Sequence, residues 1–173
     1  MIARLTVEGT AIDVPVTQAK DNVKYLNTDV AGELSFAGNP FLDYRNSADF
    51  SDVYAVIYGH HMEDHLMFGD LDLCLTDAFW EGTRAGALLL PDGRRLTIRF
   101  FAAVRTTGDD DRFFDPLYAA NNWDGEHLAA MTEGAAVSYG TIAQGDRVLA
   151  LSTCEGANTE GRILLLGKLE DAR

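Results

Sequence analysis

Cysteines, basic residues and long hydrophobic runs are scarce in this sequence. Its 173 residues include 2 cysteines, so a framework of several disulfides is excluded, and a chain of this length buries about two thirds of its unfolded surface without one. The 14 basic residues are outnumbered by 27 acidic ones, which gives a net charge of −13. That charge opposes sequence-independent binding to nucleic acid or to an anionic membrane surface. We therefore expect one domain with its own core and no nucleic-acid partner.

No stretch of the sequence reaches the apolar length of a membrane span, and no charged and then apolar leader stands at its start. A strand pattern begins directly after Met1, in IARLTVEG. We expect a further segment upstream of this start in the natural protein.

The sequence does contain a series of short β-type runs, rich in β-branched and aromatic residues and separated by turns. Helix-compatible spacing is rarer, and one such segment opens on an aspartate cap and ends near a glycine. Strands are expected within 3–16 (two), 39–46, 53–60, 86–107 (two, around a Pro-Asp-Gly turn), 146–154 and 161–169, and helical turns within 21–27, 65–82 and 124–134. This pattern predicts a mostly-β fold, a closed or nearly closed barrel with appended helices.

The two cysteines stand in different surroundings. Cys74 lies in the apolar run LDLCLTDAFW, where a free cysteine usually acts as a small buried hydrophobe. Cys154 ends the strand-like run RVLALSTC, in which alternation places Val148, Ala150, Ser152 and Cys154 on one face. The two cysteines could pair in principle, but the apolar setting of Cys74 favours a packing role for it.

A cation is expected beside Cys154. If the last two strands pair antiparallel across the loop EGANTEG, Arg162 at the start of the second strand stands near Cys154 at one end of the sheet. A positive neighbour stabilises a thiolate and lowers the pKa of the thiol, which a buried structural cysteine does not need. The pairing therefore predicts a thiolate site. The alternative for Arg162 is an ion pair at the strand end, with Glu155 or Glu160.

Four histidines are candidates for the acid–base partner of this thiol. His127 lies in the helix expected at 124–134 and is most simply a surface residue. His60, His61 and His65 crowd the end of VYAVIYGH, where a lone histidine is otherwise a solvated or hydrogen-bonded side chain. We expect one of these three to serve the cysteine.

The motifs IYGHHM and LSTCEG, with Arg162 eight positions after Cys154 in GRILLLGKL, resemble the histidine, cysteine and arginine motifs of sortases, in detail those of class B. GTAIDVPVTQAKDNVKYLN, AGNPFLDYRN and MFGDL are similar to that class as well, so the resemblance extends from about Leu5 to Leu169.

This resemblance implies a sortase-type closed β-barrel of about eight strands, with a helical N-terminal extension and a helix in the long connection before the cysteine strand. Residues 1–173 would form a single sortase catalytic domain. The N-terminal strands and the short helical extension would lie in 1–50, and the core with the catalytic motifs in 51–173.

The same resemblance implies roles for single residues. The family's histidine directly follows the glycine of the GH pair, which is His60 here, and leaves His61 as a neighbour. Cys154 is implied as the nucleophile, and Arg162 as the cation that binds the substrate and stabilises the oxyanion. The residues implied to contact the substrate are Asn22, Leu26, Tyr58, Ser152 and Glu155. Packing alone could also explain Leu26, and Glu155 could be a solvated loop carboxylate. Neither a metal nor a cofactor is implied.

The implied activity is transpeptidation at the surface of a Gram-positive cell. The enzyme would cleave the sorting-signal peptide of a secreted surface protein, form a thioacyl intermediate and transfer the protein to an amine of the peptidoglycan precursor. A pilin lysine as the acceptor is one alternative, and water, in a plain cysteine endopeptidase, is another. The implied location is the extracellular face of the cell membrane, with membrane contact only through an N-terminal anchor outside this chain.

Other classes of protein fit these motifs less well. HHMEDH resembles the H-x-H-x-D-H ligand set of metallo-hydrolases, but Met62 stands in place of the second histidine and only His127 remains to complete a site. The acidic run GDDDR is more simply a solvated turn than a calcium site. A catalytically silent binding barrel is the last alternative, and it predicts no thiolate reactivity.

Overall fold

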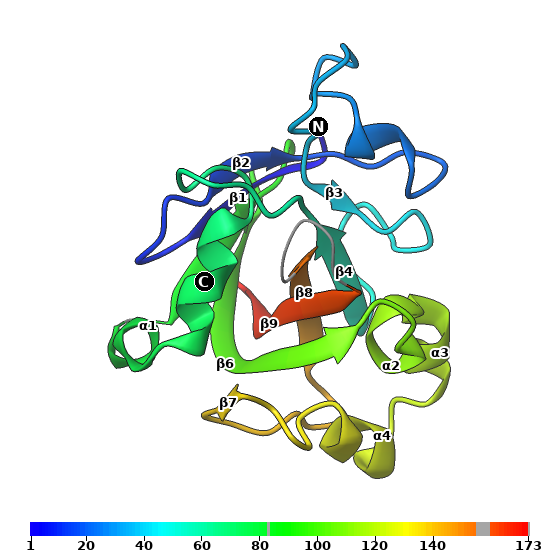
Figure 1. Ribbon diagram of the computed structural model, residues 1–173. Coiled ribbons are helices and arrows are strands. Elements are labelled where there is room, and N and C mark those ends of the chain that lie inside the picture. The colour runs from blue at the N-terminus through cyan, green and yellow to red at the C-terminus, as the bar shows by residue number, and fades with distance from the viewer. Residues whose placement is uncertain (83, 155–159, 173) are drawn as a thin grey trace.

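The computed structural model describes residues 1–82, 84–154 and 160–172, with Cys154 described by its backbone alone. Over these ranges the chain forms a nine-stranded sheet that curls into a barrel, with short helices on its outside (Figure 1). The strands are β1 (Ala3–Val7), β2 (Asp13–Val16), β3 (Phe41–Leu42), β4 (Tyr54–Tyr58), β5 (Ala85–Leu89), β6 (Arg95–Thr107), β7 (Val137–Ser138), β8 (Arg147–Cys154) and β9 (Gly161–Asp171). The expected mostly-β barrel is confirmed, and the structure adds the two-residue strand β7 to the expected runs.

The barrel is nearly closed. Its strands follow the order β2-β1-β5-β6-β9-β8-β4-β3, with β7 on β6, and β4 and β8 run parallel where the other paired neighbours run antiparallel. The two ends of the series meet where Thr17, just after β2, forms a bridge with Phe41 of β3. The N–H of Leu42 donates to the Thr17 carbonyl at 2.9 Å. This bridge brings the segment 17–40, called the N-terminal extension below, beside β3 and β4.

Three short helices fill the connection between β6 and β7 and cover one side of the barrel (Figure 1). Each begins at an aspartate whose carboxylate accepts one or two backbone N–H groups of the first turn. The helices and their caps are α2 (Asp111–Phe114) with Asp110, α3 (Pro116–Asn121) with Asp115, and α4 (Gly125–Ala130) with Asp124. The expected helix at 124–134, with its aspartate cap, is confirmed in α4.

The prediction that His127, on α4, is a surface residue is wrong. Its exposed fraction is 8%. Its ring lies against Tyr118 and Trp123, with centroid distances of 5.8 and 6.4 Å. Burial lowers the pKa of His127 below its ordinary value. The helix pattern identified the element, but the fold of the connection decided which of its sides is covered.

Both faces of β8 are buried. Leu149 and Leu151 point into the barrel, where they belong to one hydrophobic cluster with Leu5. Val148 and Ala150 alternate with them on the outer face and belong to a second cluster, which the helical connection supplies with Phe113, Trp123 and Leu128. The strand that ends at Cys154 is therefore held from two sides.

A second helical segment follows β4. The expected helical region 65–82 is confirmed from Gly69 on, as the 3-10 helix η2 (Gly69–Leu75) and then α1 (Asp77–Glu81). Cys74 lies in η2 with an exposed fraction of 1%, as expected for a packing residue. Burial raises the pKa of its thiol to about 12.

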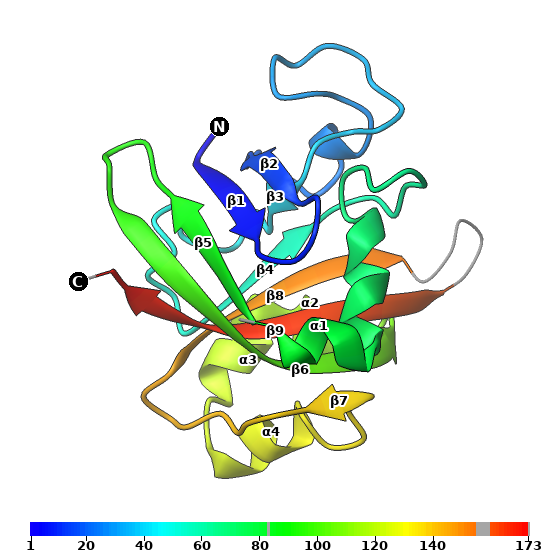
Figure 2. The ribbon, with the colours of Figure 1, turned by 90° about the vertical axis from the view of Figure 1, so that its left-hand side faces the viewer.

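The N-terminal extension contains the 3-10 turn η1 (Lys24–Leu26). The carboxylate of Asp21 accepts the N–H groups of Val23 and Lys24 and so starts this turn. The turn is flanked by Val23 and Asn27, and both residue types are weak helix formers. The loop that follows projects from the barrel at the top of Figure 2. No helix in the described part of the chain has the length and apolar character needed to cross a membrane.

Candidate active site

The three motifs meet at one end of three adjacent strands. Cys154 of β8 stands directly opposite Arg162 of β9 in the antiparallel register, which confirms the expected pairing. Parallel pairing of β4 with β8 sets Tyr58 opposite Ser152, and His60 follows two residues later. The N–H of Gly59 donates to the carbonyl of Ser152 at 3.0 Å, which continues the ladder almost to the histidine.

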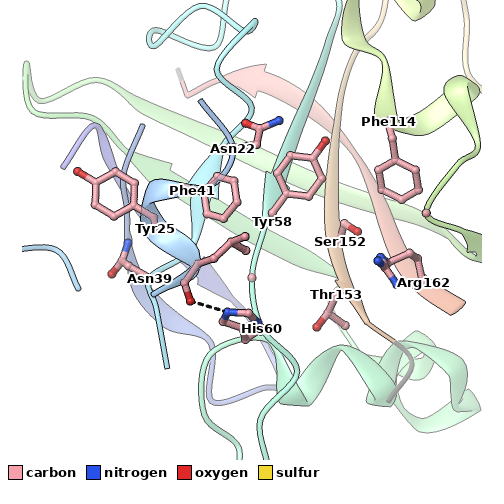
Figure 3. A pocket seen from close by; sticks show the side chains of 13 residues that line it. Asn22, Tyr25, Asn39, Phe41, Tyr58, His60, Phe114, Ser152, Thr153 and Arg162 are labelled. Carbon is pink, nitrogen blue, oxygen red and sulfur yellow. Dashed lines mark hydrogen bonds between the residues drawn. The ribbon is translucent and has the colours of Figure 1, made fainter. Parts of the chain in front are cut away.

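A cavity of about 290 Å³ opens at this end of the sheet. The N-terminal extension, the ends of β4, β8 and β9, and the helical connection all contribute to its walls (Figure 3). It is lined by Asn22, Tyr25, Leu26, Asn39, Phe41, Tyr58, Gly59, His60, Gly108, Phe114, Ser152, Thr153 and Arg162. The chain thus gathers side chains from several separate segments around one space.

The imidazole of His60 is held by the extension. Its Nε2 lies 2.7 Å from the carbonyl oxygen of Leu26, as the dashed line in Figure 3 shows. A carbonyl oxygen only accepts, so Nε2 carries a proton in this arrangement whether the ring is neutral or charged. The nitrogen that can gain and lose a proton is therefore Nδ1.

The backbone of His60 is held from the other side by Phe68. The N–H of Phe68 donates to the His60 carbonyl at 3.1 Å, and the phenyl ring is fully buried. A Cβ on Gly59 would lie 2.6 Å from Cδ2 of that ring. The glycine of the GH pair therefore allows the ring to pack directly under the backbone that carries His60.

The guanidinium of Arg162 lies against another glycine. A Cβ on Gly108 would stand 3.1 Å from the Nη2 of Arg162 and 3.3 Å from its Cζ. Arg162 Nη1 also donates to the carbonyl of Gly161 at 3.0 Å. The missing side chain at 108 leaves the space in which the guanidinium faces the cavity.

Aromatic rings form one wall of the cavity. The ring of Tyr58 lies between Phe41 and Phe114, at centroid distances of 5.3 and 6.2 Å. Its hydroxyl donates to the buried carboxylate of Asp43 at 3.0 Å. Burial is the main cause that raises the pKa of Tyr58, and the negative charge of Asp43 raises it further. The phenol is therefore neutral. This wall suits the apolar parts of an extended peptide.

Comparison with known proteins decides the family. No protein-family model matches the sequence. The chain is 31% identical over 172 residues to sortase B of Listeria monocytogenes, an alignment that covers 98% of this chain and 69% of that protein. The chain belongs to the sortase B family. It is also 29% identical to sortase B of Staphylococcus aureus, over 98% of this chain and 70% of that protein.

Solved structures agree with this membership. A Streptococcus pyogenes class B sortase involved in pilus biogenesis superposes with a TM-score of 0.90 at 35% identity, over 98% of this chain and 91% of that one. A Staphylococcus aureus sortase B–substrate complex gives a TM-score of 0.84 at 27% identity, over 99% of this chain and 80% of that one. Sortases are cysteine transpeptidases, and this sortase is therefore an enzyme of that kind.

Most residues predicted to bind substrate lie in the cavity. Asn22, Leu26, Tyr58 and Ser152 all line it, while Glu155 lies outside the described residues. Asn22 and Leu26 do not lie one turn apart on an α-helix, because η1 begins after Asn22. They reach the same cavity because the extension wraps over the end of β4.

Sequence reasoning missed several cavity residues. Asn39 and Phe41 stand within AGNPFLDYRN, a motif already used for the resemblance, so that motif could have identified them. Thr153 could not be expected beside Ser152, because neighbours on a strand face opposite ways. Its hydroxyl oxygen is buried without a hydrogen-bond partner among the described residues. Phe114 comes from the helical connection, which carries none of the motifs on which the resemblance rests.

The other histidines of HHMEDH bind separate carboxylates. The Nε2 of His61 lies 2.8 Å from an oxygen of Asp72, and His65 bonds to Asp70. Hydrogen bonding to Asp70 raises the pKa of His65. Within the described ranges, no three His, Cys, Asp or Glu side chains are grouped so that they could hold a metal ion.

Proposed function

We propose that this sortase cleaves the C-terminal sorting signal of a secreted surface protein and joins that protein to an amine. In this proposal Cys154 is the nucleophile, His60 the general acid and base, and Arg162 the group that binds the substrate and stabilises the oxyanion. The observation that supports it best is the pairing of Cys154 with Arg162 at the cavity that also holds His60.

In the first step the thiolate of Cys154 attacks the carbonyl carbon of the scissile peptide bond. The carbonyl oxygen becomes an oxyanion, which the guanidinium of Arg162 stabilises. The C–N bond then breaks, and His60 gives the proton on its Nδ1 to the departing amine. The products are a thioester on Cys154 and the released C-terminal fragment.

In the second step an amine attacks the thioester. His60, whose Nδ1 no longer carries a proton, takes the proton that the amine loses as the new amide bond forms. The C–S bond breaks and the thiolate of Cys154 returns. A thioester keeps the acyl group activated, so an amine can capture it in competition with water.

The nature of the two substrates is inferred from relatives. One related structure is a Staphylococcus aureus sortase B–substrate complex, and another is a sortase B complexed with triglycine. We infer that the cavity of this sortase takes a sorting-signal peptide and that its acceptor is an amine of a peptidoglycan precursor. The likeness to a class B sortase involved in pilus biogenesis, at 35% identity, supports a pilin lysine as the alternative acceptor.

The setting of the reaction is also a proposal. We place the enzyme at the extracellular face of the cell membrane of a Gram-positive cell, held by an N-terminal anchor outside this sequence. Residues 1–173 would act as a single catalytic domain, with the extension in 1–50 and the catalytic motifs in 51–173.

A peptide library tests the function. Internally quenched peptides with randomised positions before a threonine are incubated with the enzyme, alone and with triglycine or Nα-acetyl-lysine. We expect cleavage at one motif, a mass increase on Cys154 equal to the acyl fragment, and diversion of product to the amine. No cleavage of any peptide would overturn the proposal, and cleavage without diversion by either amine would leave a plain cysteine endopeptidase.

A further inference from the structure

A carboxylate with no exposed surface lies just behind the wall of the cavity. The side chain of Asp43, directly after β3, is 0% exposed. One of its oxygens accepts the Nε and the backbone N–H of Arg45, both at 2.9 Å. The other accepts Nη2 of Arg45 at 2.8 Å, the amide of Asn22 at 2.8 Å and the hydroxyl of Tyr58 at 3.0 Å.

These donors come from separate parts of the chain that line the cavity or lie behind it. Asn22 belongs to the N-terminal extension, and Tyr58 to the end of β4. Arg45 reaches further, since its Nη2 also donates to the carbonyl of Phe114 at 2.6 Å, and its Nη1 lies 3.3 Å from Asp115. Asp43 therefore joins, directly or through Arg45, three walls of the cavity: extension, strand and helical connection.

The charge of Asp43 matters for this role. Burial alone would raise the pKa of the carboxyl, but the hydrogen bonds from Arg45 and Asn22 and the charge of Arg45 outweigh it, and the pKa is lowered. An ionised carboxylate accepts on both oxygens, whereas an amide offers one accepting oxygen and an NH2 group that would face donors. Neutral substitution must therefore release some of the donors that Asp43 now holds.

The link to the extension continues to the catalytic histidine. The amide oxygen of Asn22 accepts the N–H of Tyr44 at 3.0 Å, so Asn22 is held to the strand end on both sides of its amide. From this anchor the chain forms η1 and presents the Leu26 carbonyl to His60.

We propose that Asp43 is a positioning residue for substrate binding, which fixes Asn22, Tyr58 and Phe114 in one arrangement. It touches neither substrate nor the reacting atoms, and it acts through the groups that line the cavity. The inference rests on the proposed function of this cavity, and it predicts that loss of the charge at 43 weakens peptide binding more than it slows the chemical step.

The test compares KM and kcat for Asp43→Asn, with the peptide selected from the library as substrate. We expect KM to rise about tenfold or more, because several hydrogen bonds to a charged group are lost, and kcat to fall by a clearly smaller factor, because His60 keeps its own bond to the Leu26 carbonyl. The rate at which iodoacetamide alkylates Cys154 should be unchanged. Asp146→Asn is the matched control, because Asp146 pairs with Lys168 near the opposite end of β8; its KM should stay at the wild-type value.

A second pair of variants covers the case in which Asp43→Asn fails to fold. Tyr58→Phe removes only the hydroxyl that donates a hydrogen bond to Asp43. Tyr54→Phe is its control, because it removes a buried hydroxyl of the same strand that donates to the Phe113 carbonyl instead. We expect a higher KM for Tyr58→Phe alone, and less than additive effects when it is combined with Asp43→Asn. A wild-type KM in a folded Asp43→Asn variant would overturn this inference, and so would a wild-type KM in Tyr58→Phe where Asp43→Asn does not fold. A wild-type enzyme that cleaves no peptide would instead overturn the proposed function itself.

Discussion

At the scale of single residues, side chains of the same type have different contacts in this structure. His60 donates to a backbone carbonyl, whereas His61 bonds to a carboxylate outside the cavity. Cys74 is buried in η2 with a raised pKa, whereas Cys154 pairs across the sheet with Arg162. Side chains of one type are therefore expected to differ in reactivity.

Cys154 is predicted to be the reactive thiol. A thiol-directed alkylating reagent at neutral pH, followed by peptide mapping, should modify Cys154 first, since burial keeps Cys74 protonated with a pKa of about 12. Cys154→Ala should abolish cleavage without changing the thermal unfolding midpoint much. In denaturant both cysteines should react, which serves as the control. Preferential modification of Cys74 in the folded enzyme would contradict the assignment.

His60 is predicted to be the acid and base. His60→Ala should lower turnover by about two to four orders of magnitude. His61→Ala should have a milder effect, because it removes only the bond to Asp72. Steady-state kinetics of the two variants check this. The reverse order of effects would place the acid and base on His61.

Arg162 is predicted to act through its planar fork of donors, which a lysine ammonium lacks. Both Arg162→Ala and Arg162→Lys should lose about 10²- to 10³-fold in turnover, the usual cost of losing an oxyanion donor. Arg99→Lys is the control, since Arg99 forms an exposed pair with Glu170 at 3.0 Å, and such pairs contribute about 1 kcal/mol or less. Near-native turnover in Arg162→Lys would contradict this role and favour the alternative, in which Arg162 forms an ion pair at the strand end.

At the scale of elements, the histidine is placed by the segments on either side of it. Strand β4 ends at Tyr58, and Gly59 and His60 then run out of the sheet between the extension and the loop before η2. In that loop Asp64, His65 and Met67 have positive φ values of 58°, 62° and 50°, a region that non-glycine residues seldom adopt. The turn returns Phe68 beneath Gly59, so the loop supports the backbone that carries the histidine.

Gly59→Ala tests this support. The added Cβ would lie 2.6 Å from the ring of Phe68, so the ring and the backbone beneath His60 must move. We expect a loss of unfolding free energy of about 1–3 kcal/mol, as for overpacked cores, together with lower kcat. Gly145→Ala is the control, because no atom lies within 4 Å of its added Cβ. Unchanged kcat in a folded Gly59→Ala variant would contradict the role given to this contact.

At the scale of the whole molecule, stability depends on carboxylates that are ionised because the fold supplies their partners. Asp110 and Asp43 both have lowered pKa values. For Asp110 the chief cause is the hydrogen bonding from Arg112. For Asp43 burial acts in the opposite direction, and the hydrogen bonds from Arg45 outweigh it. A lowered pKa means that the unfolded chain binds protons first on acidification. These groups therefore stabilise the fold above the ordinary aspartate pKa, and their contribution is lost as the pH falls below about 4.

The expected outcome is a drop in unfolding free energy between about pH 5 and about pH 3. Urea unfolding at a series of pH values measures it, and Asp43→Asn should flatten the drop, since the substituted residue does not titrate. Glu33→Gln, which changes an exposed loop residue, serves as the control. Equal slopes for the wild-type and Asp43→Asn proteins would show that Asp43 keeps an ordinary pKa.

Sequence patterns were enough to predict the features that depend on neighbours along the chain. Alternation and turn residues identified the strands, and a short connection between the last two strands sufficed to pair Cys154 with Arg162. An aspartate cap marked the start of α4 in the same way. Each of these rests on contacts between residues close in sequence, so a local pattern contains the information.

Which distant segments share the cavity depends on the packing of the whole barrel. The parallel pairing of β4 with β8 brings His60 to Cys154's strand end, and the closing of the barrel at Thr17 carries Asn22 and Leu26 over it. The packing of His127 against Tyr118 and Trp123 and the bonds from Asn22 and Tyr58 to Asp43 likewise depend on how the chain folds back on itself. Such contacts depend on how the whole barrel packs, because burial of a side chain is a property of everything around it and not of its own stretch of sequence.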